Sequence, residues 1–166
     1  MGDMSLSGRV PSNTKRNAVL RNASDRTRCR NGLLEGDEMT CLIVGDSIAV
    51  GLASALKGCL VAAKVGMGSG WIAAHTPGTI VDVAFISSGS NDPTNPNLSA
   101  NLESTRMRLT AGRIVWIKPV NPHARGVVTA VAAAHGDKAV AFMPGRDNVH
   151  PESYEALARE VNGGGS

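Results

Sequence analysis

The sequence has few aromatic residues and few cysteines, and each shortage excludes a class of protein. Aromatic residues make up 3% of the 166 positions, while glycine occurs 19 times. This composition suits tightly packed α/β layers with many turns. The three cysteines, Cys29, Cys41 and Cys59, have neither CxxC nor Cys/His ligand spacing. That pattern argues against a zinc site and against a disulfide framework, so we expect no metal, reduced cysteines and a reducing compartment.

Long apolar runs and strong charge are also missing. The most apolar stretch, 48–65, is interrupted by Lys57, Lys64 and glycines, so it does not predict a membrane span. The polar, basic start of the chain has no secretory signal pattern. We expect a protein without membrane attachment, either cytoplasmic or released or particle-associated without a signal peptide. The net charge of +3 is small and dispersed, which argues against nucleic acid as a partner.

Residues 1–38 differ in composition from the rest of the chain. The segment contains seven Lys and Arg residues and five acidic residues, and it is rich in Asn, Ser and Thr. Such a segment buries too little apolar surface to offset its ordering entropy. It therefore predicts a flexible, basic and polar N-terminal tail, with an arm for an acidic partner as the alternative. Residues 39–162 are then one domain, and 163–166 form a Gly/Ser tail of linker composition.

From Cys41 onward, short apolar runs alternate with helical patterns. The expected strands are 41–44, 60–65, 80–86, 113–117 and 139–143. The expected helices are 48–57, 98–109, 125–135 and 151–161, the last with Pro151 at its first position, where a missing N–H costs nothing. Continuous apolar strands that alternate with helices predict an α/β fold, a three-layer α/β/α sandwich around a five-stranded parallel sheet.

Four short polar blocks each follow an expected strand. They are Gly45-Asp46-Ser47, Gly66-Met67-Gly68-Ser69-Gly70, Gly89-Ser90-Asn91-Asp92 and Asp147-Asn148-Val149-His150-Pro151. In an open α/β sheet, ligands bind beyond the carboxyl ends of the strands. The sequence therefore predicts that all four blocks meet at one edge of one sheet.

The blocks contain the groups that acyl transfer needs. Ser47 is the candidate nucleophile, at a strand-to-helix junction where backbone N–H groups favour developing negative charge. His150 is the candidate base, and Asp147, three residues earlier, would orient it. Each has a simpler alternative: Ser47 could cap the helix that follows it, and Asp147 and His150 could be a surface acid and a capping histidine. Asn91 could belong to an ordinary Asn-Asp-Pro turn.

In their residues and order, the four blocks resemble those of the SGNH (GDSL-type) hydrolase family, over most of the chain. The resemblance implies a flavodoxin-like fold and a serine esterase that uses no metal or organic cofactor. It also implies an oxyanion hole formed by the N–H of Ser47, the N–H of Gly68 and the side chain of Asn91. Because the glycine block departs from the family's Gly-x-Ser-Gly spelling, Gly66 or the N–H of Ser69 are alternatives to Gly68.

The expected loops around the site indicate the kind of substrate. They carry Trp71, Asn95 and Asn121, which suit an open, polar substrate-binding groove better than a long acyl tunnel. The sequence thus favours a small-acyl, acetyl-type esterase acting on a small-molecule or carbohydrate ester, such as a cell-wall polymer. The alternatives are a lipase- or thioesterase-like activity on longer acyl chains, and a non-catalytic binding module on the same scaffold.

The glycine block also resembles part of a dinucleotide-binding fingerprint. The third glycine of that fingerprint would fall at Trp71, which does not suit close packing of helix on strand. A nucleotide-binding module would also leave Asp147 and His150 without a role. The sequence therefore favours the hydrolase over this alternative.

Overall fold

The computed structural model describes residues 29–30, 33–34 and 38–163. The flexible tail predicted for 1–38 and the Gly/Ser tail predicted for 163–166 therefore lie largely outside the described residues. The chain divides into two units between Glu38 and Met39. In the first unit, β1 (Cys29–Arg30) pairs antiparallel with β2 (Leu33–Leu34).

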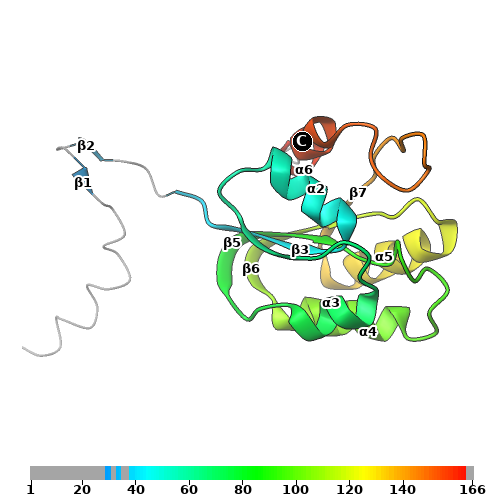
Figure 1. The fold of residues 1–166 in the computed structure, drawn as a ribbon. Helices are drawn as coiled ribbons and strands as arrows, with labels where there is room; N and C mark the ends of the chain where they lie inside the picture. Colours follow the sequence, from blue (N-terminus) through cyan, green and yellow to red (C-terminus); the bar gives the residue numbers. More distant parts are fainter. Residues whose placement is uncertain (1–28, 31–32, 35–37, 164–166) are drawn as a thin grey trace, which may run out of the picture. The chain divides into compact units, whose positions relative to one another are not determined.

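The second unit is built on a five-stranded parallel sheet, seen edge-on in Figure 1. Its strands are β3 (Cys41–Gly45), β4 (Leu60–Ala63), β5 (Ile80–Ser87), β6 (Thr110–Ile117) and β7 (Lys138–Val140). They lie in the order β4-β3-β5-β6-β7, and every neighbouring pair is parallel. This is the flavodoxin-like order, and it confirms the predicted sheet.

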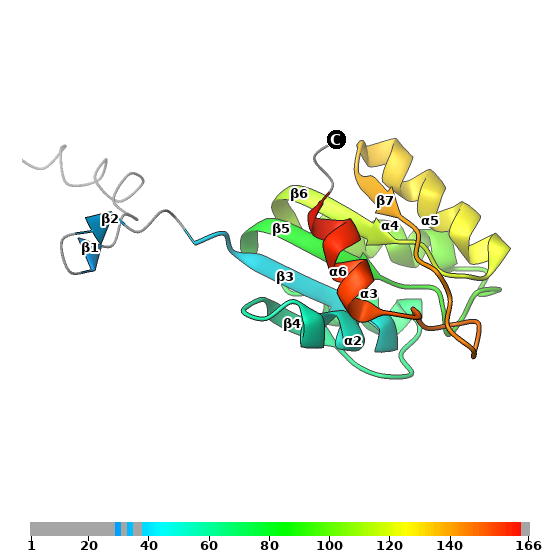
Figure 2. The same ribbon diagram turned by 90° about the horizontal axis from the view of Figure 1, so that it is seen from above.

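Helices cover both faces of this sheet, as Figures 1 and 2 show. One face carries α2 (Ser47–Ala55) and α6 (Tyr154–Asn162), and the other carries α3 (Ser69–His75), α4 (Leu98–Arg108) and α5 (Pro122–His135). The predicted three-layer α/β/α arrangement is therefore confirmed. Among the described helices, none has the length and apolar character that a membrane crossing needs.

The last helix begins later than predicted. Pro151 forms an antiparallel bridge with Pro144 instead of opening α6. The N-cap is Ser153, whose Oγ accepts the N–H of Ala156 at 3.1 Å. The prediction that Pro151 is the first helical residue was wrong, because serine caps a helix and Pro151 belongs to the preceding loop.

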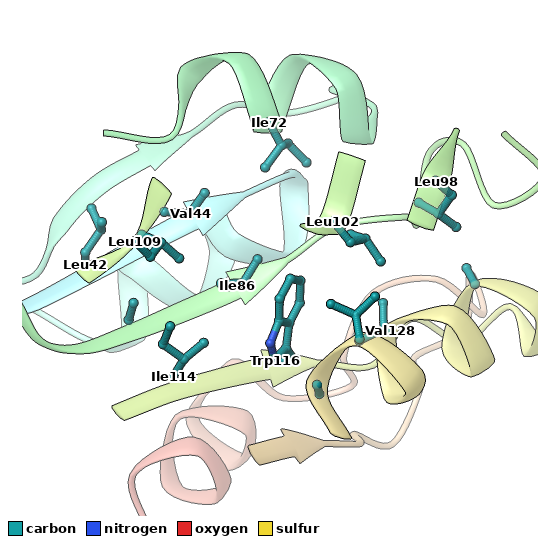
Figure 3. Close-up of a cluster of buried hydrophobic side chains, with 14 of the residues drawn as sticks. Leu42, Val44, Ile72, Ile86, Leu98, Leu102, Leu109, Ile114, Trp116 and Val128 are labelled. Atoms are coloured by element: carbon teal, nitrogen blue, oxygen red, sulfur yellow. The ribbon is translucent and has the colours of Figure 1, made fainter. Parts of the chain in front are cut away.

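Each face of the sheet has its own apolar core. On the face of α3, α4 and α5, the fully buried Trp116 lies beside Leu102 and Val128, as Figure 3 shows. The indole N–H of Trp116 donates to Asp137 Oδ2 at 3.1 Å, so its burial leaves no unpaired donor. Strands that are buried on both faces are continuous apolar runs, and this is why the apolar pattern indicated all five strands. The bounds differ in places: β6 begins at Thr110 rather than at 113, and β7 ends at Val140 rather than at 143.

Cys41 and Cys59 form a disulfide, which corrects the expectation of reduced cysteines. The parallel pairing of β3 with β4 sets Leu42 opposite Leu60. The residues immediately before them therefore lie side by side, with Cα atoms 4.7 Å apart. Sequence spacing could not reveal this pair, because the register between two strands is a property of the folded sheet. Disulfides are typical of oxidising compartments, so the cysteines give no support to a reducing one.

We predict that replacing Cys41 and Cys59 together with serine lowers the free energy of unfolding by about 3 kcal/mol, because the bridge restricts the unfolded chain. The two cysteines are 18 residues apart in sequence, so the closed loop is of moderate length. Urea unfolding measures the difference, and reduced wild-type protein should match the double variant. Equal free energies for the oxidised protein and the double variant would contradict a stabilising bridge.

Candidate active site

Ser47 is the first residue of α2 and directly follows the turn that ends β3. The turn is tight: Gly45 has a φ of 146°, and a Cβ there would lie 2.0 Å from the carbonyl oxygen of Ser87. Only glycine fits this position. Asp46 is the N-cap of α2, since its Oδ1 accepts the N–H of Ile48 at 3.0 Å. The capping role that the sequence allowed for Ser47 therefore belongs to Asp46.

Asp46 also joins β3 to β5 at this edge of the sheet. Its Oδ1 accepts the hydroxyl of Ser87 at 2.8 Å, and its backbone N–H donates to the Ser87 carbonyl at 3.2 Å. Asp46 is fully buried, and burial raises the pKa of its carboxyl, against the opposing effect of the hydrogen bonds from Ser87 and Ile48. Hydrogen bonds to both α2 and β5 therefore hold Asp46, the residue before Ser47, in place.

Ser47, His150 and Asp147 form a continuous chain of hydrogen bonds. Ser47 Oγ lies 2.8 Å from His150 Nε2, and His150 Nδ1 lies 2.5 Å from Asp147 Oδ2. An ionised carboxylate can only accept, so the Nδ1 nitrogen carries the proton and Nε2 accepts from the serine hydroxyl. The fold therefore brings together a serine, an imidazole and a carboxylate in that order, with Ser47 and His150 103 positions apart in sequence.

The carboxylate of Asp147 holds both the imidazole and the loop backbone. Its Oδ1 accepts the N–H groups of Val149 at 3.0 Å and of His150 at 2.9 Å. The hydrogen bond from the His150 side chain, followed by these two backbone bonds, lowers the pKa of the Asp147 carboxyl well below its ordinary 3.8. Asp147 is therefore an ionised carboxylate at neutral pH.

The loop that carries this pair is closed by backbone hydrogen bonds. Gly145 N–H donates to the His150 carbonyl at 2.8 Å, and Glu152 N–H donates to the Met143 carbonyl at 2.9 Å. Asn148 at the tip has a φ of 57°, a conformation that asparagine tolerates better than most residues. The sequence predicted the Asp147–His150 pair but gave no signal for this closed loop.

A close packing contact joins the helix of the nucleophile to the helix after the base. A Cβ at Gly51 in α2 would lie 2.1 Å from the ring of Tyr154, the first residue of α6. Burial, followed by the charges of Asp46 and Asp147, raises the pKa of Tyr154. The sequence analysis did not predict this contact, because one tyrosine and one glycine in two different helices form no motif that a sequence pattern would reveal.

The predicted oxyanion donors lie in loops on either side of Ser47. β3 lies between β4 and β5. Ser47 follows β3, the glycine block follows β4, and Asn91 follows β5. Asn91 Nδ2 donates to the carbonyl of Met67 at 2.9 Å, which links the two loops. The second N–H of this amide has no partner among the described residues.

The three alternatives for the backbone donor differ in their hydrogen bonds and burial. The N–H of Ser69 donates to Asp92 Oδ2 at 3.0 Å and is therefore occupied. The N–H of Gly68 has no hydrogen-bond partner within the described chain, and neither does that of Gly66. Gly68 is the N-cap of α3 and is half-buried, whereas Gly66 is exposed. Of the two glycines whose N–H has no partner among the described residues, Gly68 is thus the more sheltered.

Two hollows adjoin the chain of hydrogen bonds. One, of about 690 Å³, is lined by Asp147, His150 and neighbours in the 144–152 loop. The other, of about 310 Å³, is lined by Ser90, Pro93, Val120, Asn121, Pro122, Asn148 and Val149. The larger hollow is bordered by charged side chains and prolines, and the smaller one by polar side chains, prolines and two valines. Among the described residues, no group of three or more His, Cys, Asp or Glu is placed to hold a metal ion.

The three residues predicted for substrate binding have different surroundings. Asn121 lines the smaller hollow, although its Oδ1 is used to cap α5. Asn95 donates to Asp92 Oδ2 at 2.9 Å, within its own loop. The Trp71 ring stacks on His75, with centroids 4.1 Å apart, and packs against the core. Of the three, Asn121 is the one that borders a hollow next to the loop of His150.

We predict that Asp147→Asn lowers the melting temperature at neutral pH and that this difference shrinks in acid. Because the pKa of Asp147 is lowered in the folded chain, its contribution is present above its ordinary 3.8 and is lost as the pH falls below that value. Thermal unfolding of both proteins between pH 2 and pH 7 measures the effect. A difference that stays constant or grows toward low pH would contradict the pairing of Asp147 with His150.

Comparisons with known proteins give one structural neighbour. No protein-family model matches the chain, and no match was found among curated proteins. The chain is similar to the C-terminal catalytic domain of peptidoglycan O-acetyltransferase A (OatA) from Streptococcus pneumoniae, in a structure with a methylsulfonyl adduct. The TM-score is 0.49 with 20% sequence identity, over 74% of this chain and 87% of that one.

Proposed function

We propose that this chain is a serine hydrolase that cleaves carboxylic esters through an acyl-enzyme. The observation that carries the proposal is the contact of 2.8 Å between Ser47 Oγ and His150 Nε2, with Asp147 on the far side of the imidazole. Serine becomes a nucleophile when an adjacent base takes its proton. A serine that served as a helix cap would not need such a base.

Acylation begins with attack of Ser47 Oγ on the ester carbonyl carbon. The hydroxyl proton passes to His150 Nε2, and the imidazolium that forms is stabilised by the ionised Asp147. The carbonyl electron pair moves onto its oxygen, which becomes the oxyanion. When the tetrahedral species collapses, His150 returns the proton to the departing alcohol oxygen, and the acyl group stays on Ser47.

Deacylation repeats these steps with water. His150 takes a proton from the water as it attacks the acyl carbon, and then returns a proton to Ser47 Oγ as the carboxylic acid leaves. The groups proposed to stabilise the oxyanion are the N–H of Ser47, the N–H of Gly68 and Nδ2 of Asn91. Support comes from the free N–H of Gly68 and from the position of β3 between the strands that precede the other two donors.

The proposed substrate is a small-acyl ester, of the acetyl type, on a carbohydrate or cell-wall polymer. The side chains of His150 and Asp147 are 38% and 53% exposed, so the reacting groups lie at an open surface. The larger hollow beside them is lined by charged and polar side chains and prolines, and the smaller one by two amides, a hydroxyl, prolines and two valines. Neither lining forms a long apolar tunnel. An open polar surface favours a large hydrophilic alcohol and a short acyl group.

We predict that Ser47→Ala lowers kcat by about 10⁴-fold or more, because no other group replaces the nucleophile. Turnover of p-nitrophenyl acetate measures the loss, and an unchanged melting temperature shows that the fold is retained. Ser54→Ala on the exposed side of the same helix is the matched control and should keep wild-type turnover. Appreciable turnover by Ser47→Ala would mean that another residue is the nucleophile.

We also predict that kcat/KM decreases along the p-nitrophenyl esters from acetate to octanoate. The expected reason is the lack of a long apolar pocket for the acyl chain beside His150. Steady-state kinetics on the ester series measures the preference. A preference for octanoate over acetate would contradict the proposed acyl length and favour a lipase- or thioesterase-like activity.

A further inference from the structure

Asp92 is the centre of a partly buried polar network next to the proposed oxyanion donors. Its Oδ2 accepts the N–H of Ser69 at 3.0 Å, the hydroxyl of Ser69 at 2.6 Å and Nδ2 of Asn95 at 2.9 Å. Ser69 Oγ in turn accepts Nδ2 of Asn101 at 2.9 Å. One carboxylate oxygen thus connects the loop after β5, the start of α3 and the helix α4.

This network fixes both of the loops that carry the proposed donors. Ser69 is fully buried and directly follows Gly68, so the bond to its N–H holds the Gly68–Ser69 peptide, which is next to the Met67–Gly68 peptide that carries the Gly68 N–H. Asn91 directly precedes Asp92 and donates to the Met67 carbonyl, one residue before Gly68. The two proposed donors are therefore connected to each other through Asp92 on one side and Met67 on the other.

Close packing at Gly68 reinforces this connection. A Cβ at Gly68 would lie 3.1 Å from Asp92 Oδ2 and 3.2 Å from its Cγ. The φ of Gly68 is −83°, which any residue adopts. A side chain at position 68 would press on the Asp92 carboxylate, which would have to move by a few tenths of an ångström, whereas the backbone conformation sets no limit.

The network also contains an unpaired oxygen. Asp92 Oδ1 is buried and has no hydrogen-bond partner within the described chain. An unpaired buried acceptor reduces stability, and a residue chosen for stability alone would not need it. Buried polar groups without a partner are uncommon in native structures, and each calls for an explanation.

We propose that Asp92 is the positioning residue of the oxyanion hole. Its Oδ2 holds the Ser69 N–H, so that the Gly68 N–H stays directed to the developing oxyanion and the Asn91 amide keeps its orientation. The inference rests on the proposed esterase function. Asp92 touches neither the substrate nor Ser47, His150 or Asp147, and it takes no part in proton transfer.

The test is steady-state kinetics of Asp92→Ala and Asp92→Asn on p-nitrophenyl acetate. Donors that act on the oxyanion stabilise the transition state, so Asp92→Ala should lower kcat by about 100-fold with KM little changed. Asp92→Asn keeps an oxygen that can accept from Ser69, so its kcat should be at least about tenfold higher than that of Asp92→Ala. The shape of the pH profile should stay that of the wild type, because His150 and Asp147 are untouched.

Thr94→Ala is the matched control. Thr94 is exposed in the same loop and has no hydrogen bond among the described residues, so kcat and KM should stay at wild-type values. If Asp92→Ala does not fold, Ser69→Ala takes its place. That variant removes the hydroxyl bond to Asp92 while keeping the backbone bond, and it should lower kcat by about tenfold at unchanged KM.

The inference is overturned if folded Asp92→Ala, or Ser69→Ala in its place, keeps wild-type kcat, or if the loss in kcat/KM is entirely a rise in KM. It is also overturned if Asp92→Asn is as impaired as Asp92→Ala. Ser47→Ala in the same assay separates the hypothesis about Asp92 from the esterase mechanism on which it rests. An inactive Ser47→Ala beside a fully active Asp92→Ala contradicts the role of Asp92 alone, whereas an active Ser47→Ala contradicts the esterase mechanism.

Discussion

The pairing of β3 with both β4 and β5 is the constraint on which the candidate site depends. Because the three strands are parallel and adjacent, their carboxyl ends bring the Ser47 turn, the glycine block and the Asn91 loop to one edge. The Asp46–Ser87 contact joins β3 to β5 at that edge. At the opposite end, the Cys41–Cys59 disulfide joins β3 to β4. The strand that leads to the proposed nucleophile is thus fixed at both ends.

The proposed catalytic groups are held by two different kinds of structure. On the oxyanion side, Asp92 and Ser69 form a compact, partly buried network between loops and helices. On the base side, His150 and Asp147 lie in an exposed loop that is closed by its own backbone bonds. Contact of Tyr154 with Gly51 then holds the helix after this loop against the helix of Ser47. An open loop at the proposed base, beside a hydrogen-bonded network at the proposed oxyanion donors, suits the proposed substrate, whose alcohol part is large and remains in solvent.

Much of the fold and of the site could be predicted from sequence, because both depend on local patterns. Continuous apolar runs marked the buried strands, and the spacing of Asp147 and His150 brings a carboxylate and an imidazole together within one loop. What could not be predicted depends on contacts between distant segments. The register of β3 on β4 decides the disulfide, and the approach of Asp92 to Ser69 occupies the Ser69 N–H. Pro151 was misjudged for a similar reason, since its bridge to Pro144 outweighs its preference for the first turn of a helix.

The central claim is that Ser47 is a nucleophile activated by His150, and covalent labelling tests it most directly. The folded protein would be treated with a fluorophosphonate, and the adduct counted and located by intact-mass and peptide mass spectrometry. We expect one adduct per chain, on Ser47, formed far more slowly in His150→Ala. No adduct, an adduct on another residue, or labelling of Ser47 at an unchanged rate in His150→Ala would contradict the account.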